Sequence, residues 1–426
     1  MFGSLAVMAG ILLGQADTPL DEDLGLQVRR LVRQLDALEL DRRNDAEQQL
    51  VKLGPAILNL LGELEEGKSA EVKQRIGRIR QKLQRVLAES AVKASVVTLR
   101  GEAMPLSKIL SAIQEQTGNT IVDFRRRFGQ QAPDPELDVD FDKTPFWEAL
   151  DRVLDQAELS VYPYGEAKAV SVVARTDTQL PRSAQASYSG PFRFEAIGIR
   201  AERDLRNPGN DSLVLTLEVA WEPRLAPINL QQRMADLMAV DENGAPLPIA
   251  VRQAELEVPV NPESMAVELT VPLALPPRNV KQIAQLKGSL TALVPGKIET
   301  FRFKDLAEAK NVERRVAGVT VVLEQVRKRN EGIWEVRMGV RFDQAGGALA
   351  SHRTWIEENE AFLEGPDGKP IDWATFETTR QTENEVGFAY LFGLDGPLAG
   401  HSFVYKTPGM IFSAGLEYQV KGIDLP

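Results

Sequence analysis

Residues 97–123, VTLRGEAMPLSKILSAIQEQTGNTIVD, contain a complete strand–helix–strand pattern. A β-branched run is followed by Leu106, Ile109, Leu110 and Ile113 at helical spacing, and Thr-Gly-Asn then precedes a second apolar run. Apolar residues three and four positions apart share one helix face, whereas short β-branched runs beside turn residues are typical of strands. The stretch therefore predicts a compact βαβ unit.

Further elements extend this unit to residues 95–175. A second helix is predicted over 145–156, with Thr144 as its cap and Pro145 in its first turn. Together the elements predict a small two-layer α+β domain with helices over one face of a sheet. Its remaining strands are expected at 137–141, 160–164 and 169–174.

Two segments of this domain, VTLRGEAMPLSKILSAIQEQTGNTIV and LDVDFDKTPFWEALDRVLDQAELSVYPYG, resemble the secretin and TonB short N-terminal domain. The Leu-x-x-Ile…Thr-Gly and Pro-Phe-Trp-Glu-Ala-Leu-Asp elements occur in the order seen in that family. The resemblance covers residues 95–175 and implies a non-enzymatic envelope module that makes protein contacts. The rest of the sequence departs from the usual setting of family members, so a general interaction module is implied rather than a transport role.

Residues 17–94 are predicted to form a bundle of short antiparallel helices, because apolar side chains recur there at helical spacing. The segment RRNDAEQQLVKLGPAILNLL resembles a HEAT-type repeat, although one or two repeats are too few for a solenoid. The last helix is also basic, which fits either a patch for nucleic acid or acidic lipid or, as we favour, the solvated face of an amphipathic helix. The apolar stripes are expected to comprise Leu24, Val28, Leu31, Leu35 and Leu38, and Val72, Ile76, Ile79, Leu83 and Val86.

The first residues, MFGSLAVMAGILLGQADTP, predict export. An uncharged apolar run from Phe2 to Gly14 precedes Ala16, which suits signal-peptidase cleavage, so residues 1–16 are interpreted as a signal peptide. The run is too short to span a bilayer as a helix, and it lacks a basic start. A retained anchor and a buried cytosolic helix remain as alternatives. We expect a periplasmic or cell-envelope location, with membrane contact only through this segment.

The remainder of the chain is predicted to be β-structure. Residues 176–191 are polar and rich in turn formers, and are interpreted as a linker. Short alternating strands then predict two antiparallel β-sandwiches, at 192–310 and 311–426. A faint internal duplication accompanies them, with KIETFRFKDL closing the first half and GLEYQVKGIDL closing the second. The predicted fold class is thus multidomain α+β.

The composition excludes several classes of site. The chain has 426 residues, no cysteine and two histidines, and its formal net charge is −11. Without cysteine there are no disulfides, thiolate metal sites or cysteine nucleophiles. The acidic balance argues against DNA or another nucleic acid as partner, because such binding needs clustered positive charge.

Few residues carry candidate chemistry. His352 and His401 lack the spacing of a metal-binding motif, and Asp138, Asp140 and Asp142 lack the register of a calcium loop. Glu357, Glu358 and Asp372 could form the carboxyl pair of a glycosidase only if they flank a cleft. We therefore predict no catalytic, cofactor-binding or metal-binding residues. A short basic cluster in a loop of the α+β domain is the one candidate for partner contact, and it comprises Arg125, Arg126, Arg127 and Phe128.

These observations predict a non-enzymatic exported structural or interaction protein whose partner is another, unidentified envelope protein. The order of the segments resembles that of exported envelope proteins of planctomycete-type bacteria, which implies no activity. One alternative is a carbohydrate-binding or carbohydrate-active protein, and another is an accessory part of a secretion machine in the outer membrane. The carbohydrate alternative depends on exposed sandwich tryptophans, which would be Trp221, Trp334, Trp355 and Trp373.

Overall fold

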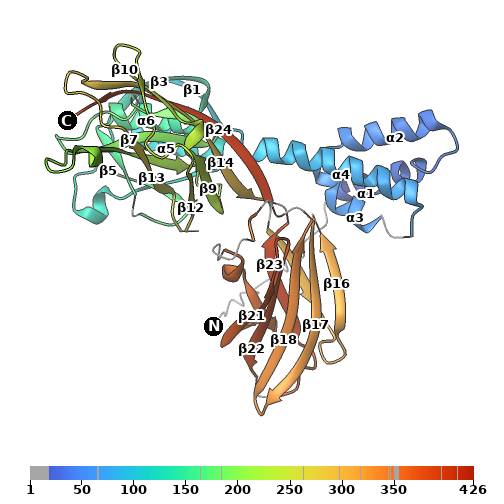
Figure 1. Ribbon diagram of the computed structural model, residues 1–426. Coiled ribbons are helices and arrows are strands. Elements are labelled where there is room, and N and C mark those ends of the chain that lie inside the picture. Colours follow the sequence, from blue (N-terminus) through green and yellow to red (C-terminus); the bar gives the residue numbers. More distant parts are fainter. Residues whose placement is uncertain are drawn as a thin grey trace, which may run out of the picture. The chain divides into compact units, whose positions relative to one another are not determined.

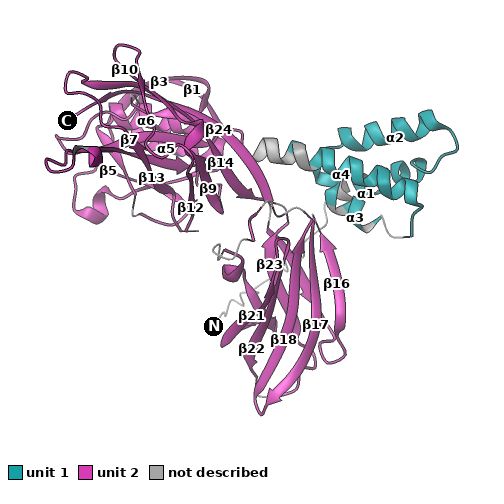
Figure 2. Cartoon of the chain, in the orientation of Figure 1, with its two compact units in different colours: residues 1–87 teal, residues 88–426 magenta. Residues whose placement is uncertain are grey.

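The structure is a computed structural model, and the chain divides into two compact units, residues 1–87 and 88–426 (Figure 2). The predicted signal peptide, residues 1–16, and His352 lie outside the residues that the structure describes. Of the described helices, none is both long and apolar enough to cross a membrane. The described residues are 19–64, 67–163, 165–183, 185–261, 263–296, 298–316, 318–343, 345, 347–349, 355–394, 396–409 and 411–426.

The first unit is helical, as the apolar spacing predicts. Its buried side chains include Val28, Leu31 and Ile76 of the predicted stripes, together with Leu50 and Leu61 of α2 and α3. Leu38 is fully exposed, contrary to the prediction, because α1 ends at Gln34 and the chain turns before α2. Val86 is also exposed, at 46%. The helices are α1 (Pro19–Gln34), α2 (Leu40–Lys52), η1 (Pro55–Ile57), α3 (Leu58–Glu63) and α4 (Ala70–Ala91).

Basic residues of α4 hold that helix to α2. The nearly buried Glu47 of α2 lies 3.2 Å from Arg75, 3.2 Å from Arg78 and 3.4 Å from Lys82. Burial raises the pKa of Glu47, but the bonds and charges of Arg78 and Lys82 outweigh this and lower it. Part of the basic face is therefore used for helix packing.

The α+β module follows, and it contains both predicted helices. In one sheet β1 pairs antiparallel with β3, and in the other β5 lies between β2, its parallel neighbour, and β4, its antiparallel neighbour. Ile109, Ile113, Phe146 and Leu150 from the two helices fill the core. The elements are β1 (Val96–Pro105), α5 (Leu106–Thr117), β2 (Thr120–Asp123), η2 (Arg125–Phe128), β3 (Glu136–Pro145), α6 (Phe146–Gln156), β4 (Leu159–Tyr162) and β5 (Ala169–Ala174).

The module is built from two similar halves. Each of β1 and β3 ends in a proline, Pro105 or Pro145, that stands directly before a helix. Two residues before each proline the backbone has positive φ, 47° at Ala103 and 50° at Lys143. In both halves this uncommon conformation coincides with an irregularity in the β1–β3 pairing, just before the strand ends at its proline.

A first sandwich is formed by a four-stranded sheet, in the order β13-β8-β7-β6, facing a six-stranded sheet (Figure 1). Phe194 and Trp221 from the first sheet and Leu290 from the second are buried together. The strands are β6 (Ser187–Ser189), β7 (Phe192–Glu202), β8 (Ser212–Trp221), β9 (Asn229–Arg233), β10 (Met238–Asp241), β11 (Pro246–Leu247), β12 (Glu255–Pro259), β13 (Ala266–Leu273), β14 (Gln282–Pro295) and β24 (Ile411–Asp424), with short helices η3 (Pro208–Asn210) and η4 (Met234–Asp236).

The second β domain also has two sheets, ordered β15-β23-β19-β20 and β16-β17-β18-β22-β21. Phe303, Val321, Phe388 and Tyr405 are among its buried core residues. The fold class predicted from sequence is therefore confirmed: helices, a small mixed-sheet region and antiparallel sheets that pair as sandwiches. The elements are β15 (Ile298–Phe303), β16 (Lys310–Val316), β17 (Val319–Asn330), β18 (Ile333–Phe342), η5 (Trp355–Glu358), β19 (Ala361–Glu364), β20 (Pro370–Asp372), β21 (Thr375–Gln381), β22 (Glu385–Gly393) and β23 (Ser402–Pro408).

The boundary between the sandwiches differs from the predicted one at residues 310 and 311. β15, which was expected to close the first sandwich, pairs with β23 of the second. β24, which was expected to close the second sandwich, pairs with β14 of the first over its whole length. The second domain is thus inserted between β14 and β24. Both segments alternate as half-buried strands should, and alternation does not specify a pairing partner.

Part of the predicted linker at 176–191 is hydrogen-bonded to the α+β module and to the first sandwich. The Asp155 carboxylate at the end of α6 accepts hydrogen bonds from the backbone N–H groups of Arg182 and Ser183, both at 2.9 Å. β6 then pairs with β7 in the first sandwich. The Arg182 side chain also donates to Glu195 of β7 at 2.9 Å, so this polar residue bonds to both sides of the junction.

A buried ion pair joins the α+β module to the first sandwich. Asp151 of α6 and Arg193 of β7 are 0% exposed, and their side chains lie 2.6 Å apart. Tyr188 also donates to Asp151 at 2.9 Å, and Glu195 accepts from Arg193 at 2.7 Å. Burial raises the pKa of Glu195, but the charges of Arg193 and Arg182 outweigh this and lower it.

A second polar contact lies at the other end of this junction. Glu222, at the end of β8, is fully buried and accepts from the backbone N–H of Ser95 at 2.9 Å and from its hydroxyl at 2.7 Å. Asn119 donates to the same carboxylate at 3.1 Å. Two separated polar contacts fix both the position and the rotation of the module on the sandwich.

Replacing Asp151 with alanine leaves the Arg193 charge buried without its principal partner. We expect Asp151→Ala to lower the free energy of unfolding by about 3–5 kcal/mol. The control is Arg100→Ala, which breaks the exposed 2.8 Å pair with Asp140 and is expected to cost less than about 1 kcal/mol. Urea unfolding of the full chain, followed by circular dichroism, measures both. Equal losses would contradict the role of the buried pair.

Candidate functional site

The predicted contact residues lie in η2, a turn held against the sheet of the α+β module. Phe124, just before η2, donates its backbone N–H to the Val172 carbonyl of β5 at 2.8 Å. Gly129 ends the turn with φ of 66°, a conformation that favours glycine. The Gln130 N–H then bonds to the Arg125 carbonyl at 2.9 Å, so the backbone of this basic segment is fixed.

Arg125 has a structural role. It is 5% exposed, and it donates to the Asp123 carboxylate at 2.7–3.1 Å and to the Pro133 carbonyl at 2.9 Å. Burial raises the pKa of Asp123, but its hydrogen bonds with Arg125 outweigh this and lower it. The sequence prediction that Arg125 contacts a partner is not supported by this placement, since its guanidinium is already used inside the module.

Arg126 and Arg127 are exposed, unlike Arg125. The Arg127 guanidinium lies 4.4 Å from the centroid of the Phe124 ring and pairs with Glu166 at 2.6 Å. A guanidinium over an aromatic face is attracted by the ring quadrupole. Arg127 is therefore oriented at the surface by two neighbours.

Phe128 is 50% exposed, and the edge of its ring contacts Tyr162 at a centroid distance of 5.0 Å. Phe124 packs beside both rings, at 6.2 Å from Phe128 and 6.3 Å from Tyr162. We call the group of Phe124, Arg126, Arg127, Phe128 and Tyr162 the arginine–aromatic cluster. The contact residues predicted from the sequence did not include Phe124 and Tyr162, which reach the cluster because β2 and β4 both flank β5.

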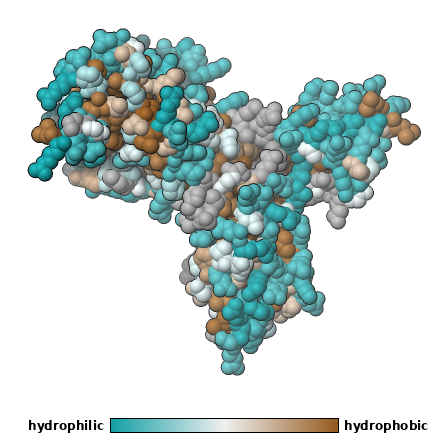
Figure 3. All heavy atoms as spheres, viewed as in Figure 1, coloured by the Kyte–Doolittle hydropathy of each residue, from teal (hydrophilic) through white to brown (hydrophobic). Residues whose placement is uncertain are grey.

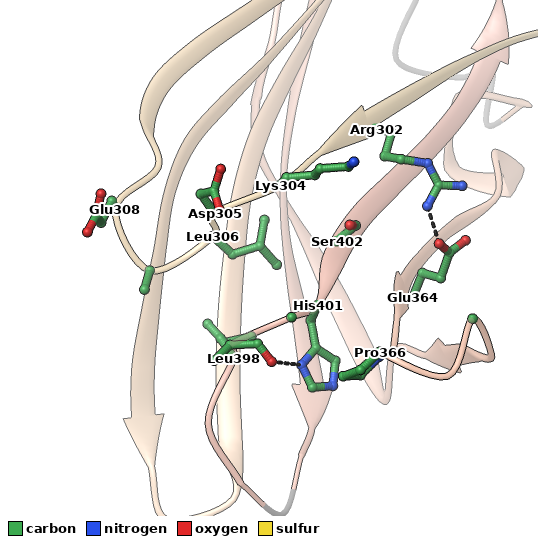
Figure 4. Close-up of a pocket in the computed structure, with 15 residues that line it drawn as sticks. Arg302, Lys304, Asp305, Leu306, Glu308, Glu364, Pro366, Leu398, His401 and Ser402 are labelled. Atoms are coloured by element: carbon green, nitrogen blue, oxygen red, sulfur yellow. Dashed lines mark hydrogen bonds and ion pairs between the residues drawn. The ribbon is translucent and has the colours of Figure 1, made fainter.

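His401 lies in a groove of about 790 Å³ at one end of the second β domain (Figure 4). Its Nδ1 atom is 3.3 Å from the carbonyl oxygen of Ala399, and the nearby Glu364 is bonded to Arg302. The His401 ring thus lies beside a backbone carbonyl, and the Glu364 carboxylate that lines the groove is paired with an arginine. Among the described residues, His401 has no carboxylate as a hydrogen-bond partner.

Two of the alternating acids, Asp138 and Asp140, bind the neighbouring strand. Asp138 accepts from the backbone N–H of Ala103 at 2.9 Å, and Asp140 pairs with Arg100 at 2.8 Å. Within the described part of the chain, no three acidic or histidine side chains are grouped closely enough to hold a metal ion. The alternating acids thus connect β3 to β1.

The sandwich tryptophans pack against the protein cores. Trp221 is buried, Trp334 and Trp355 lie partly buried against the second core, and Trp355 donates to the Ala348 carbonyl at 2.7 Å. Trp373 is also partly buried and meets the Phe376 ring edge-on at 5.1 Å. No two of these rings therefore form an exposed platform.

The acidic residues that the sequence suggested as a carboxyl pair lie together in the structure. Glu357, Glu358, Asp372 and Trp373 line a single groove of about 540 Å³ in the second β domain. Lys406 also lines it and pairs with Glu360 at 2.7 Å. The groove presents carboxylates beside the indole ring of Trp373.

Comparisons with protein-family models, curated proteins and solved structures gave no match for this chain.

Arg125 and Arg126 are adjacent in sequence but differ in burial, so they form a matched pair of variants. We expect Arg125→Ala to lower the free energy of unfolding by about 1–3 kcal/mol, and Arg126→Ala by less than about 0.5 kcal/mol. The pKa of Asp123 is lowered in the folded protein, so its pairing with Arg125 stabilises the wild type at pH values above the unfolded pKa, about 3.9. This stabilisation is lost as the pH falls through the lower pKa of the folded state. The difference in the free energy of unfolding between pH 7 and acid pH, measured by urea unfolding, should therefore be smaller in Arg125→Ala than in the wild type. Identical curves for the two variants would contradict this assignment.

Proposed function

We propose that this chain is a non-enzymatic, exported interaction protein of the cell envelope that binds another protein through the arginine–aromatic cluster. The observation that carries the proposal is the half-exposed Phe128 ring, which is held against Tyr162 beside the oriented Arg127. Aromatic and arginine side chains supply a large share of the binding energy at protein interfaces. Most of the visible surface is hydrophilic instead (Figure 3).

The rigidity of the cluster supports this role. Arg125 holds the turn from inside, and Glu166 and Phe124 orient Arg127 before any partner arrives. A surface that is ordered in advance loses less side-chain entropy on binding. The module itself is fixed to the first sandwich by Asp151 and Arg193, so the cluster is carried by a large rigid body.

The location is supported by sequence features alone. The apolar run from Phe2 to Gly14 has the pattern of an export signal. Residues 95–175 resemble the secretin and TonB short N-terminal domain, whose members make protein contacts in the envelope. Both features favour an envelope partner, and the net charge of −11 disfavours a nucleic acid.

Phe128→Ala tests the proposal because it removes the exposed ring but leaves Arg125 and the core in place. Full-length chain immobilised on beads is expected to capture a protein from envelope extract, and the variant to capture at least about tenfold less. Quantitative mass spectrometry of cross-linked eluates measures the ratio. Met238→Ala is the control, because Met238 is a 62% exposed apolar side chain far along the sequence in β10. Equal capture by Phe128→Ala and wild type, or no captured protein, would refute the proposal.

A second candidate function is carbohydrate binding in the groove beside Trp373. The observation that favours it is the gathering of Glu357, Glu358 and Asp372 around that ring. Sugars are held in protein sites by apolar contact with a ring together with a few polar groups that bond to hydroxyls. Trp373 is partly buried, so only part of its ring is available for such contact.

Calorimetric titration with cell-wall oligosaccharides tests this candidate. If the groove binds sugar, the wild type should give saturable heat, and Trp373→Ala should weaken binding about tenfold or more. Trp334→Phe is the control, since Trp334 is also partly buried against the second core but does not line this groove. Absence of heat with wild type, or equal affinity in Trp373→Ala, removes the carbohydrate candidate.

A further inference from the structure

The second β domain carries an arginine cluster that the interaction proposal does not use. Arg327 and Arg329 on β17 and Arg337 on β18 surround Glu335, which lies opposite Arg327 in the strand register. We call these three arginines the arginine triad. Their side chains alternate with the core residues Val326, Val336 and Met338, so they lie on the outer face of the sheet.

Glu335 is the centre of the triad. Its side chain is 0% exposed, and it accepts an Nε–H bond from each arginine, at 2.7 Å from Arg327 and 2.8 Å from Arg337. Burial raises the pKa of Glu335, but the hydrogen bonds of Arg327, Arg337 and Arg329 outweigh this and lower it. The carboxylate therefore remains charged and fixes one edge of every guanidinium.

The triad has more arginines than acidic partners, unlike Arg380 and Arg341 on the same sheet. Arg380 is bonded to both Glu324 and Glu385, and Arg341 lies 3.7 Å from Glu313. Three guanidinium groups share the single buried carboxylate of Glu335. Among the residues that the structure describes, the other acid paired with the triad is Glu377 of β21, which is 63% exposed and 3.8 Å from Arg329. The local charge stays positive when both acids are counted.

The free edges of two arginines point away from Glu335. Arg327 and Arg337 bond through Nε to the same oxygen of Glu335, Oε1, so both guanidinium groups converge on one carboxylate atom. Their Nη groups form no hydrogen bond with any residue that the structure describes. Their side chains are 48% and 34% exposed. Two planar N–H forks are thus ordered by Glu335 and open to solvent.

We propose that the arginine triad binds a tetrahedral oxyanion, namely phosphate, either free or as the monoester group of a larger molecule. The fork of a guanidinium matches two oxygens of a phosphate, and adjacent forks can contact one phosphate from two directions. The phosphate also supplies between one and two negative charges near pH 7, which opposes the excess positive charge of the triad. Glu335 acts here as a positioning residue that aligns the donors.

The test uses the full chain and two probes, inorganic phosphate and glucose 6-phosphate, with acetate as a planar monovalent comparison. Arg337→Gln removes one fork but leaves Glu335 two arginine partners, and we expect it to weaken phosphate binding about tenfold. Arg341→Gln removes the same charge from the same sheet face and is expected to leave binding within about twofold. Isothermal titration at low ionic strength measures each constant, and added sodium chloride should weaken binding.

A readout on the wild type keeps the proposal testable if Arg337→Gln does not fold. Addition of phosphate should shift the guanidinium NMR signals of Arg327, Arg329 and Arg337 more than that of Arg380. Equal binding of both probes would assign recognition to the phosphate group alone, and tighter binding of glucose 6-phosphate would assign it to a monoester. The proposal is overturned if phosphate does not bind saturably, if both variants weaken binding equally, if acetate binds as well as phosphate, or if other signals shift instead.

Discussion

The pair of Asp151 and Arg193 determines how the larger unit is assembled. Neither side chain has any exposed surface, so each charge depends on its partner inside the protein. An isolated buried charge is strongly unfavourable, whereas a paired and hydrogen-bonded one is tolerated. Helix α6 must therefore dock on β7 in one register. The polar residues that follow α6 are then drawn into the same junction through Asp155, Arg182 and Ser183.

The pairing of β14 with β24 imposes a second constraint. Tyr418 of β24 stacks on Phe194 of the opposite sheet at 4.4 Å, and its hydroxyl donates to Gln232 at 2.9 Å. Gly288 of β14 lies opposite Tyr418, where a Cβ atom would be 2.4 Å from the ring. The first core therefore needs a strand from the end of the chain. Such a contact of long sequence separation carries a large loop-closure cost and slows folding.

Both proposed binding surfaces follow one physical pattern. In η2, the buried Arg125 is bonded to Asp123 and orders a turn whose neighbours Arg127 and Phe128 face outward. In the second β domain, the buried Glu335 orders three arginines whose outer edges face solvent. A buried charge in each case fixes the geometry of exposed groups. Preorganisation of this kind lowers the entropy that a ligand or partner must remove on binding.

The local pattern of the sequence was sufficient to predict most of the helices and strands. Helical spacing located α5 and α6, and alternation located the β-rich half of the chain. Leu38 was misplaced because periodicity continues past the point where α1 ends. The predicted boundary between the two sandwiches, at residues 310 and 311, was wrong because KIETFRF and GLEYQVK alternate in the same way. Only their packing shows that these strands belong to different cores.

The candidate sites likewise depend partly on the local sequence and partly on the tertiary structure. The sequence by itself determined that Arg125, Arg126, Arg127 and Phe128 form a local basic cluster with one aromatic residue, because the four residues are consecutive. Only the tertiary structure decided that Arg125 is internal while Arg127 and Phe128 are presented outside. It also decided that Arg327, Arg329 and Arg337 share Glu335. The physical reason is that burial and charge pairing depend on which strands become neighbours, and a period of alternation along one strand carries no information about the next.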